Sequence, residues 1–213
     1  MRKFLSYLYW KLFPIKGDSK NNKIEIASKR RGDVRLRVNG ITNKIIIEKD
    51  ILLNNLDITI SGNNNVVIIS NGCKIFNLKL QIVGENSVFK VDQYASLRDV
   101  NVVIWEGQSV SIGKDCMLSY GVNIRTTDSH GIYDVITKQR INPSKSIIIG
   151  EHVWIGQNTT LLKGTSIGEH SVVGFGSTCT KDYPSNCIIA GSPAKVVKKD
   201  IDWDRELSDF LYQ

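Results

Sequence analysis

The sequence predicts an all-β protein built as a parallel β-helix, a solenoid in which short strands stack coil upon coil. Between residues 149 and 184 a small or aliphatic apolar residue returns at every sixth position. These positions are Ile149, Ile155, Leu161, Ile167, Val173 and Cys179. Three hexads form one coil of three short strands, and only a stack of coils buries a continuous core. No stretch between residues 32 and 195 has the pattern of a long amphipathic helix.

The coils before residue 104 are predicted to be longer. Four glycines recur at intervals somewhat longer than three hexads, and each opens a polar corner before an alternating strand: Gly40, Gly62, Gly84 and Gly107. Glycine adopts the positive φ that such corners require, and short runs rich in β-branched residues between Gly and Asn are typical of strands. A sandwich or jelly roll of alternating strands is the alternative, but neither requires six hexads in phase.

The hexad pattern stops for about one coil, and residues 125–146 are predicted to form a loop that leaves the solenoid. Long loops on rigid scaffolds usually carry function. This loop contains His130, one of three histidines, with Asp128 two positions before it. We therefore expect the chemistry of the protein to lie where the repeat is interrupted.

The remaining histidines and the cysteines do not predict a metal site. His152 and His170 lie three hexads apart, which places them one coil apart at a corner where we expect them to be solvated. The chain has no His-x4-His pair, so no metal is expected. Four cysteines without CxxC spacing are predicted to be buried free thiols in a reducing cytosol: Cys73, Cys116, Cys179 and Cys187.

The net charge of +7 is concentrated in residues 1–31, which hold nine Lys or Arg against two acidic residues. The rest of the chain is neutral overall, so we expect no nucleic-acid partner. The aromatic stretch 1–16 is too short to span a bilayer, which takes about 20 residues. It either lies in the headgroup layer of an anionic membrane or packs on the body or a neighbouring subunit. The protein is expected to be cytoplasmic, with association at the inner membrane face as the open alternative.

Three domains are predicted: a basic aromatic segment over 1–31, the β-helix over 32–198, and a short C-terminal helix over 199–213. The C-terminal stretch has the composition of a helix that begins near Asp200 or Asp202 and folds back on the solenoid.

The motifs VWIG at 153–156, T-K-D-x-P at 180–184 and A-G-S-P-A-K at 190–195, together with the hexads, give the chain a family resemblance. Over residues 104–199 it resembles the hexapeptide-repeat acyltransferases, which include galactoside, maltose, nodulation-factor and xenobiotic acetyltransferases and the O-acetyltransferases of bacterial capsule and O-antigen. The resemblance implies a left-handed β-helix assembled as a homotrimer with active sites between subunits. It also implies acetyl-CoA as donor, lying in the groove between two solenoids.

The resemblance assigns roles to particular residues. His130 matches the family's general base, which takes the proton from a sugar hydroxyl as that hydroxyl attacks the thioester directly; imidazole suits this task near neutral pH. Trp154 matches a tryptophan that lines the donor or acceptor cleft, and Gly156 and Gly174 match corners passed by the pantetheine arm. Four further residues match positions at the pantetheine end and the CoA phosphates: Thr180, Lys181, Lys195 and Lys198.

The chain departs from the compact sugar acetyltransferases in its longer N-terminal coils and its basic tail. We therefore predict an O-acetyltransferase that acts on a sugar hydroxyl of a bacterial surface polysaccharide, with sialic-acid-containing capsules among the candidate acceptors. Two alternatives remain open at this stage. One is N-acetylation of a nucleotide-linked amino sugar or a small xenobiotic, and the other is a non-catalytic β-helix scaffold.

Overall fold

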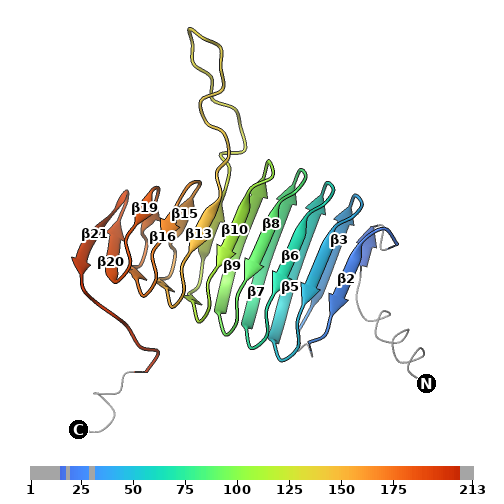
Figure 1. Cartoon of the computed structure of the whole chain (residues 1–213), viewed down its shortest axis with the longest axis horizontal. Coiled ribbons are helices and arrows are strands. Elements are labelled where there is room, and N and C mark those ends of the chain that lie inside the picture. Colours follow the sequence, from blue (N-terminus) through green and yellow to red (C-terminus); the bar gives the residue numbers. More distant parts are fainter. Residues whose placement is uncertain (1–14, 18–19, 29–31, 207–213) are drawn as a thin grey trace.

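Short strands stacked coil upon coil form the body of the chain, from which one long loop projects (Figure 1). The computed structural model describes residues 15–17, 20–28 and 32–206. All but one of the strand pairs in this part are parallel, and it contains no helix. The all-β, left-handed parallel β-helix predicted from the sequence is confirmed.

The long coils contain the strands up to the first regular hexads. They are β1 (Ile15–Gly17), β2 (Lys23–Ile26), β3 (Val34–Asn39), β4 (Lys44–Ile47), β5 (Leu52–Ser61), β6 (Val66–Ile69), β7 (Lys74–Val83), β8 (Val88–Val91), β9 (Ser96–Trp105) and β10 (Ser109–Ile112).

The short coils and the closing hairpin contain the rest. They are β11 (Met117–Leu118), β12 (Val122–Arg125), β13 (Ile147–Ile149), β14 (Trp154–Ile155), β15 (Thr160–Leu162), β16 (Ser166–Ile167), β17 (Val172–Val173), β18 (Thr178–Cys179), β19 (Asp182–Tyr183), β20 (Cys187–Gly191) and β21 (Ala194–Lys199).

The strand register confirms both predicted periods. In the eight-stranded sheet, whose order is β19-β16-β13-β10-β8-β6-β4-β2, Ile45 pairs with Val67 and Val67 with Phe89, at the same interval that separates the glycine corners. In the short coils Trp154 pairs with Val172, three hexads further along the chain. The other sheet has 13 strands and covers the remaining faces of the solenoid. Successive coils therefore stack strand on strand along every face.

The core runs along the axis of the stack. All six residues that define the hexad pattern are at most 1% exposed: Ile149, Ile155, Leu161, Ile167, Val173 and Cys179. Each buried aliphatic side chain of this size contributes roughly 1.5–3 kcal/mol to folding. The four cysteines are also buried and free, and burial raises the pKa of Cys116 to about 12, so this thiol stays protonated at neutral pH.

The corners of the long coils are stabilised by a ladder of buried amides. Asn65 is fully buried; its Nδ2 donates to Asn43 Oδ1 at 3.0 Å and to the Gly84 carbonyl at 2.9 Å, and its Oδ1 accepts from the backbone N–H of Ser87 at 2.9 Å. At the same corner Gly62 has φ 140°, and a Cβ there would lie 2.0 Å from the carbonyl oxygen of Gly84. Only glycine fits, because the backbones of successive coils touch.

The two ends of the chain differ from the predicted boundaries. The stack begins before residue 32, because β1 pairs with β3 and β2 pairs with β4. Of the segment 1–16, residues 1–14 lie outside the described part. The C-terminal helix predicted for 199–213 is not formed over 199–206: β21 extends to Lys199, and residues 200–206 follow without helix. Its last residues, 207–213, lie outside the described part.

Within the described residues, no helix has the length and apolar character needed to cross a bilayer.

Candidate active site

The loop leaves the stack between β12 and β13 and projects far from it (Figure 1). Val110 and Ile147 pair across the interruption, although the chain between them is about twice as long as a regular short coil. The two arms of the loop pair at Tyr133 and Arg140. At its turn, Asp134 Oδ1 accepts hydrogen bonds from the backbone N–H groups of residues 136 and 137. The loop is thus an ordered hairpin arm.

His130 lies at the base of this arm and is exposed. Its carbonyl oxygen accepts a hydrogen bond of 2.9 Å from Nδ2 of Asn142 on the returning arm. Within residues 15–17, 20–28 and 32–206, the imidazole ring has no hydrogen-bond partner. The backbone of His130 is therefore held in place, while its ring is held by no hydrogen bond from the described residues.

Asn142 is the residue that ties the two arms together at their base. It is 7% exposed; its Nδ2 also donates to Asp128 Oδ2 at 2.8 Å, and its Oδ1 accepts from the backbone N–H of Ile132 at 2.7 Å. Lys163, on the next coil, contacts both the Asp128 carboxylate and the Asn142 carbonyl. Lys163 and Asn142 hold the pKa of Asp128 below its ordinary value. Asp128 thus fixes the base of the arm through Lys163 and makes no hydrogen bond to the His130 ring.

A second tether joins the arm to the last long coil. Arg140 donates to Glu106 Oε1 at 2.5 Å, and the backbone N–H of Ser144 donates to Glu106 Oε2 at 3.1 Å. These hydrogen bonds from Arg140 and Ser144 lower the pKa of Glu106 to about 2. Arg140 is consequently paired within the chain rather than free to attract an acidic ligand.

Three of the four residues assigned to the CoA end lie close together. The backbone N–H of Thr180 donates to Tyr183 Oη at 3.4 Å, and Tyr183 Oη donates to the Ala194 carbonyl at 3.1 Å. Tyr183 therefore brings Thr180 and Lys181 to the start of β21, beside Lys195. Lys198 lies further along β21, opposite Ile188. Thr180 and all three lysines are exposed.

The stacking places these residues on the same edge of the solenoid as the arm. Arg125, directly before the arm, pairs with Leu162, and Leu161 pairs with Cys179, directly before Thr180. The base of the arm, Lys163 and Lys181 thus follow one another on successive coils along one edge. Because adjacent coils are strand-paired, these residues form a continuous row along the stack.

Trp154, Gly156 and Gly174 lie elsewhere on the chain. Trp154 begins β14, is 38% exposed, and no contact joins it to His130 among the described residues. Gly156 and Gly174 occupy the following corner on successive coils. A Cβ on Gly156 would lie 2.8 Å from the Val173 carbonyl, whereas one on Gly174 would make only ordinary contact with Ala190. Coil stacking alone thus requires glycine at 156 but not at 174.

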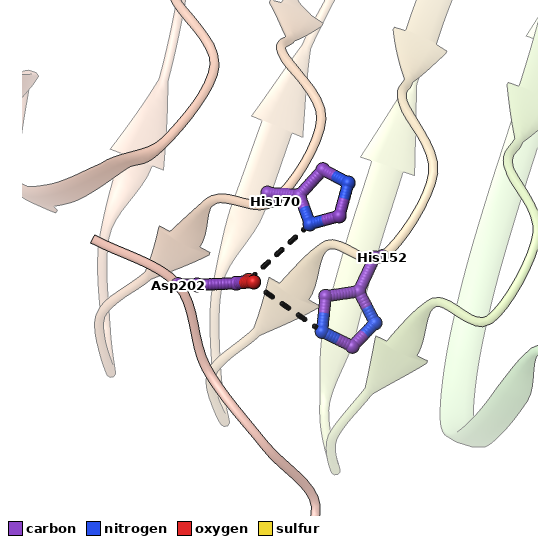
Figure 2. Close-up of side chains that lie close together, drawn as sticks. All are labelled: His152, His170 and Asp202. Atoms are coloured by element: carbon purple, nitrogen blue, oxygen red, sulfur yellow. Dashed lines mark hydrogen bonds and ion pairs between the residues drawn. The ribbon is translucent and has the colours of Figure 1, made fainter. Parts of the chain in front are cut away.

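The C-terminal segment 200–206 passes over the corner that carries His152 and His170 (Figure 2). His152 Nδ1 bonds to Asp115 Oδ2 at 2.7 Å, and its ring stacks on Trp203 with centroids 4.3 Å apart. Burial alone would lower the pKa of His152, but the Trp203 carbonyl and the Asp115 carboxylate outweigh it and raise the pKa. The expectation that these histidines are merely solvated is wrong, because the end of the chain folds onto them.

This segment also reaches the predicted cleft residue. The Trp203 ring lies 5.9 Å from that of Trp154, centroid to centroid, at an interplanar angle of 45°. Trp203 Nε1 donates to the His152 carbonyl at 2.7 Å, so the indole is held both by this hydrogen bond and by stacking on the imidazole. Trp154 therefore forms part of an aromatic pair.

Comparison with known proteins relates this architecture to a family. The model of the family "Bacterial transferase hexapeptide (six repeats)" matches residues 146–181. The chain is 41% identical over 103 residues to a polysialic acid O-acetyltransferase of Escherichia coli O1:K1 / APEC, a match covering 48% of this chain and 34% of that protein. The matched part thus spans about a third of that relative's length.

Two solved structures match nearly the whole chain. The polySia specific acetyltransferase NeuO has a TM-score of 0.84 at 36% identity, covering 92% of this chain and 90% of that one. The polysialic acid O-acetyltransferase OatWY has a TM-score of 0.85 at 35% identity, covering 92% of each chain. The chain belongs to the bacterial hexapeptide transferases. The family predicted from the motifs is confirmed, and the similarity extends into the long coils as well.

Several residues of this hexapeptide transferase were not identified from its sequence. Asn142 lies in the returning half of the loop, and nothing in the local pattern marked it as the tie at the base of the arm. Lys163 and Asp115 are ordinary corner residues in the hexad pattern. Trp203 had a signal, since an aromatic residue in a charged C-terminal stretch suggests docking, but its position beside Trp154 depends on the path of the chain.

Proposed function

We propose that this hexapeptide transferase transfers the acetyl group of acetyl-CoA to a hydroxyl of a sugar in a bacterial surface polysaccharide. The observation that supports this best is the match over 92% of the chain to two acetyltransferases described as specific for polysialic acid or as acting on it. Both matches include the long coils, which lie outside the resemblance seen in the sequence over residues 104–199. An acidic polymer that contains sialic acid is therefore the first acceptor to test.

The proposed mechanism uses His130 as general base. The imidazole accepts the proton of the sugar hydroxyl, whose oxygen attacks the thioester carbonyl; the C–S bond then breaks, and the thiolate leaves as CoA after taking up the proton. The ordered base of the arm favours this role, because Asn142 fixes the His130 backbone and leaves the ring free. A positioned general base typically contributes about 10²–10⁴-fold to the rate.

We propose that acetyl-CoA lies along the edge formed by Thr180, Lys181 and Lys195, with Lys198 further along β21. The exposed lysines supply positive charge that can pair with the phosphates of CoA. In the absence of CoA, each of them is an ordinary surface residue. Gly174, at a different corner, fits a ligand that passes close to that corner, because the fold of the chain itself leaves room for a side chain there. Acetyl-CoA is a co-substrate in this proposal.

A homotrimer accounts for the separation of the assigned residues. Within one chain, His130 and the lysines lie on one edge, whereas Trp154 and Gly174 lie on other parts of the coil. Packing of one solenoid's edge against a neighbour's face would bring the two groups to one groove. In this arrangement the active site is shared between subunits. In this proposal the reaction takes place in the cytoplasm, where acetyl-CoA is the donor, and residues 1–16 contact either the membrane surface or the trimer.

The test is acetyl transfer measured by mass spectrometry with acetyl-CoA and purified polysialic acid, set beside neutral capsule polysaccharides. We expect O-acetylated sialic acid from the wild-type chain and a fall of at least about 100-fold for His130→Ala. Calorimetry with CoA provides the control, since His130→Ala should bind CoA as the wild type does. Undiminished transfer by His130→Ala would contradict the mechanism. Absence of CoA binding by the wild type would contradict the function itself.

A further inference from the structure

Two of the three histidines of the chain meet an aspartate from its C-terminal segment at one corner of the solenoid (Figure 2). His152 and His170 come from successive coils, three hexads apart, and Asp202 comes from the segment that passes over them. One ligand atom from each lies within 4.8 Å of the others. The acetyl-transfer mechanism uses none of these three residues.

The spacing of the three ligand atoms is close to that of a tetrahedral metal site. Bonds of roughly 2.0–2.1 Å from Zn²⁺ to nitrogen and oxygen place neighbouring ligand atoms about 3.3 Å apart. His170 Nδ1 lies 3.3 Å from Asp202 Oδ1, and His152 Nε2 lies 3.7 Å from the same oxygen. The side chain of His170 is 37% exposed, so its ring has room for the small movement that brings its Nδ1 nearer to His152 Nε2.

His152 is already oriented as a metal ligand. Its Nδ1 bonds to Asp115 Oδ2 at 2.7 Å, the arrangement by which a carboxylate fixes a ligating imidazole and raises its basicity. Arg205 donates two hydrogen bonds to the other oxygen, Oδ1 of Asp115, and so fixes that carboxylate in turn. The remaining ring nitrogen of His152, Nε2, points toward Asp202 (Figure 2).

A second oxygen atom lies close to His152 Nε2. The carbonyl oxygen of Trp203 is 2.8 Å from Nε2, nearer than the Asp202 carboxylate oxygen at 3.7 Å. An ion bound to Nε2 would therefore lie beside this carbonyl, which comes from the same C-terminal segment as Asp202.

We propose that His152, His170 and Asp202 form a binding site for a first-row transition metal of the Zn²⁺ class. Two imidazoles and one carboxylate suit Zn²⁺ rather than Mg²⁺ or Ca²⁺, which prefer oxygen ligands. The Trp203 carbonyl oxygen, 2.8 Å from His152 Nε2, is the nearest candidate for a fourth ligand. The ion bridges two coils and the C-terminal segment, so that its binding holds Trp203 against Trp154. The proposal is independent of the acetyl transfer.

The first test is calorimetric titration of the full chain, without an affinity tag and freed of metal, with Zn²⁺ alone at neutral pH. We expect one ion per chain with a dissociation constant below about 10 μM. His170→Ala and Asp202→Asn, both at accessible positions, should each weaken binding at least about tenfold. His130→Ala is the matched control, because it removes the one histidine outside the cluster and should leave Zn²⁺ binding unchanged.

Two further measurements report on geometry and on the C-terminal segment. Co²⁺ in place of Zn²⁺ should give the intense visible absorption of a tetrahedral complex, and His170→Ala should lose it. Hydrogen exchange of residues 200–206 should slow when Zn²⁺ is added to the wild type and stay unchanged in His170→Ala. A dissociation constant for Zn²⁺ above about 10 μM in the wild type, or equal binding by His170→Ala, overturns the proposal.

Discussion

Removal of the Asn142 side chain should impair catalysis without unfolding the solenoid. Asn142→Ala breaks the hydrogen bonds to Asp128 Oδ2 at 2.8 Å, to the His130 carbonyl at 2.9 Å and from the backbone N–H of Ile132 at 2.7 Å. It also removes a longer one of 3.3 Å from Arg140 Nε. All four lie at the base of the arm, outside the apolar core. The change should therefore release the backbone that carries His130 while the coils stay intact.

The expected size follows from the three shorter bonds, because Arg140 stays paired with Glu106 when the longer one is lost. Two neutral hydrogen bonds contribute about 1 kcal/mol each, and the one to the Asp128 carboxylate about 1.5–3 kcal/mol. Water replaces part of this hydrogen-bond free energy at the exposed base of the arm, and the contacts of Lys163 and Glu106 remain. We therefore expect the variant to lose roughly 2 kcal/mol of the free energy that holds the base of the arm in place. A loss of about 2 kcal/mol in the population of the reactive arrangement lowers the transfer rate about 30-fold.

The assay is kcat/KM for acetyl transfer in a double-mutant cycle with His130→Ala, with thermal unfolding as the measure of stability. If Asn142 acts by placing His130, the double variant should be no slower than His130→Ala alone. Gln139→Ala is the control on the same arm, since its side chain makes no hydrogen bond within the described residues. Full activity in Asn142→Ala, or an additive loss in the double variant, would refute the reasoning.

Three further predictions concern pH, packing and the amide ladder. The pKa of Glu106 is lowered in the fold to about 2, so its stabilisation of the arm is complete above its ordinary value of 4.5 and is lost as pH falls through about 2. The protection of the arm's amides against hydrogen exchange, relative to their intrinsic rates, should fall over this range, and Glu106→Gln should lower this protection already at pH 7. Gly156→Ala should cost about 1–3 kcal/mol in chemical denaturation because its Cβ meets backbone, whereas Gly174→Ala should leave stability unchanged and raise KM for acetyl-CoA. Asn65→Ala should cost about 2–4 kcal/mol, since it leaves buried backbone groups of neighbouring coils unpaired, and a thermal midpoint equal to that of the wild type would contradict this.

The repeat could be read from the sequence because a solenoid is determined by local periodicity. A residue at every sixth position faces the inside of the solenoid, because each strand of a short coil repeats after six residues. The buried side chains of Ile155, Ile167 and Val173 follow this rule, and each coil contacts only its neighbours. The loop was equally predictable, since an interruption of a regular period is visible without any knowledge of where the chain goes. The start of the stack was less predictable, because β1 and β2 precede the first clear glycine corner.

The C-terminal segment shows the limit of this kind of inference. Composition suggested a helix after Lys199, but the path of the chain there is set by contacts with residues far away in sequence. Trp203 stacks on His152, 51 positions earlier, and Arg205 reaches Asp115, 90 positions earlier. These contacts compete successfully with a short isolated helix, which is marginal in water.

The sequence by itself determined the β-helix, its two coil lengths, the position of the arm with His130 and the family, because all of these follow from repeats and contiguous motifs. Only the tertiary structure decided how the chemistry is arranged. It showed that Asn142 bonds to the His130 carbonyl and that Lys163 contacts the Asn142 carbonyl. It also showed that Trp154 lies on another part of the coil than His130, and that Asp202 lies next to His152 and His170. The physical reason is that stacking turns a separation of one coil into direct contact, while the arm and the C-terminal segment are positioned by side-chain bonds that no local pattern records.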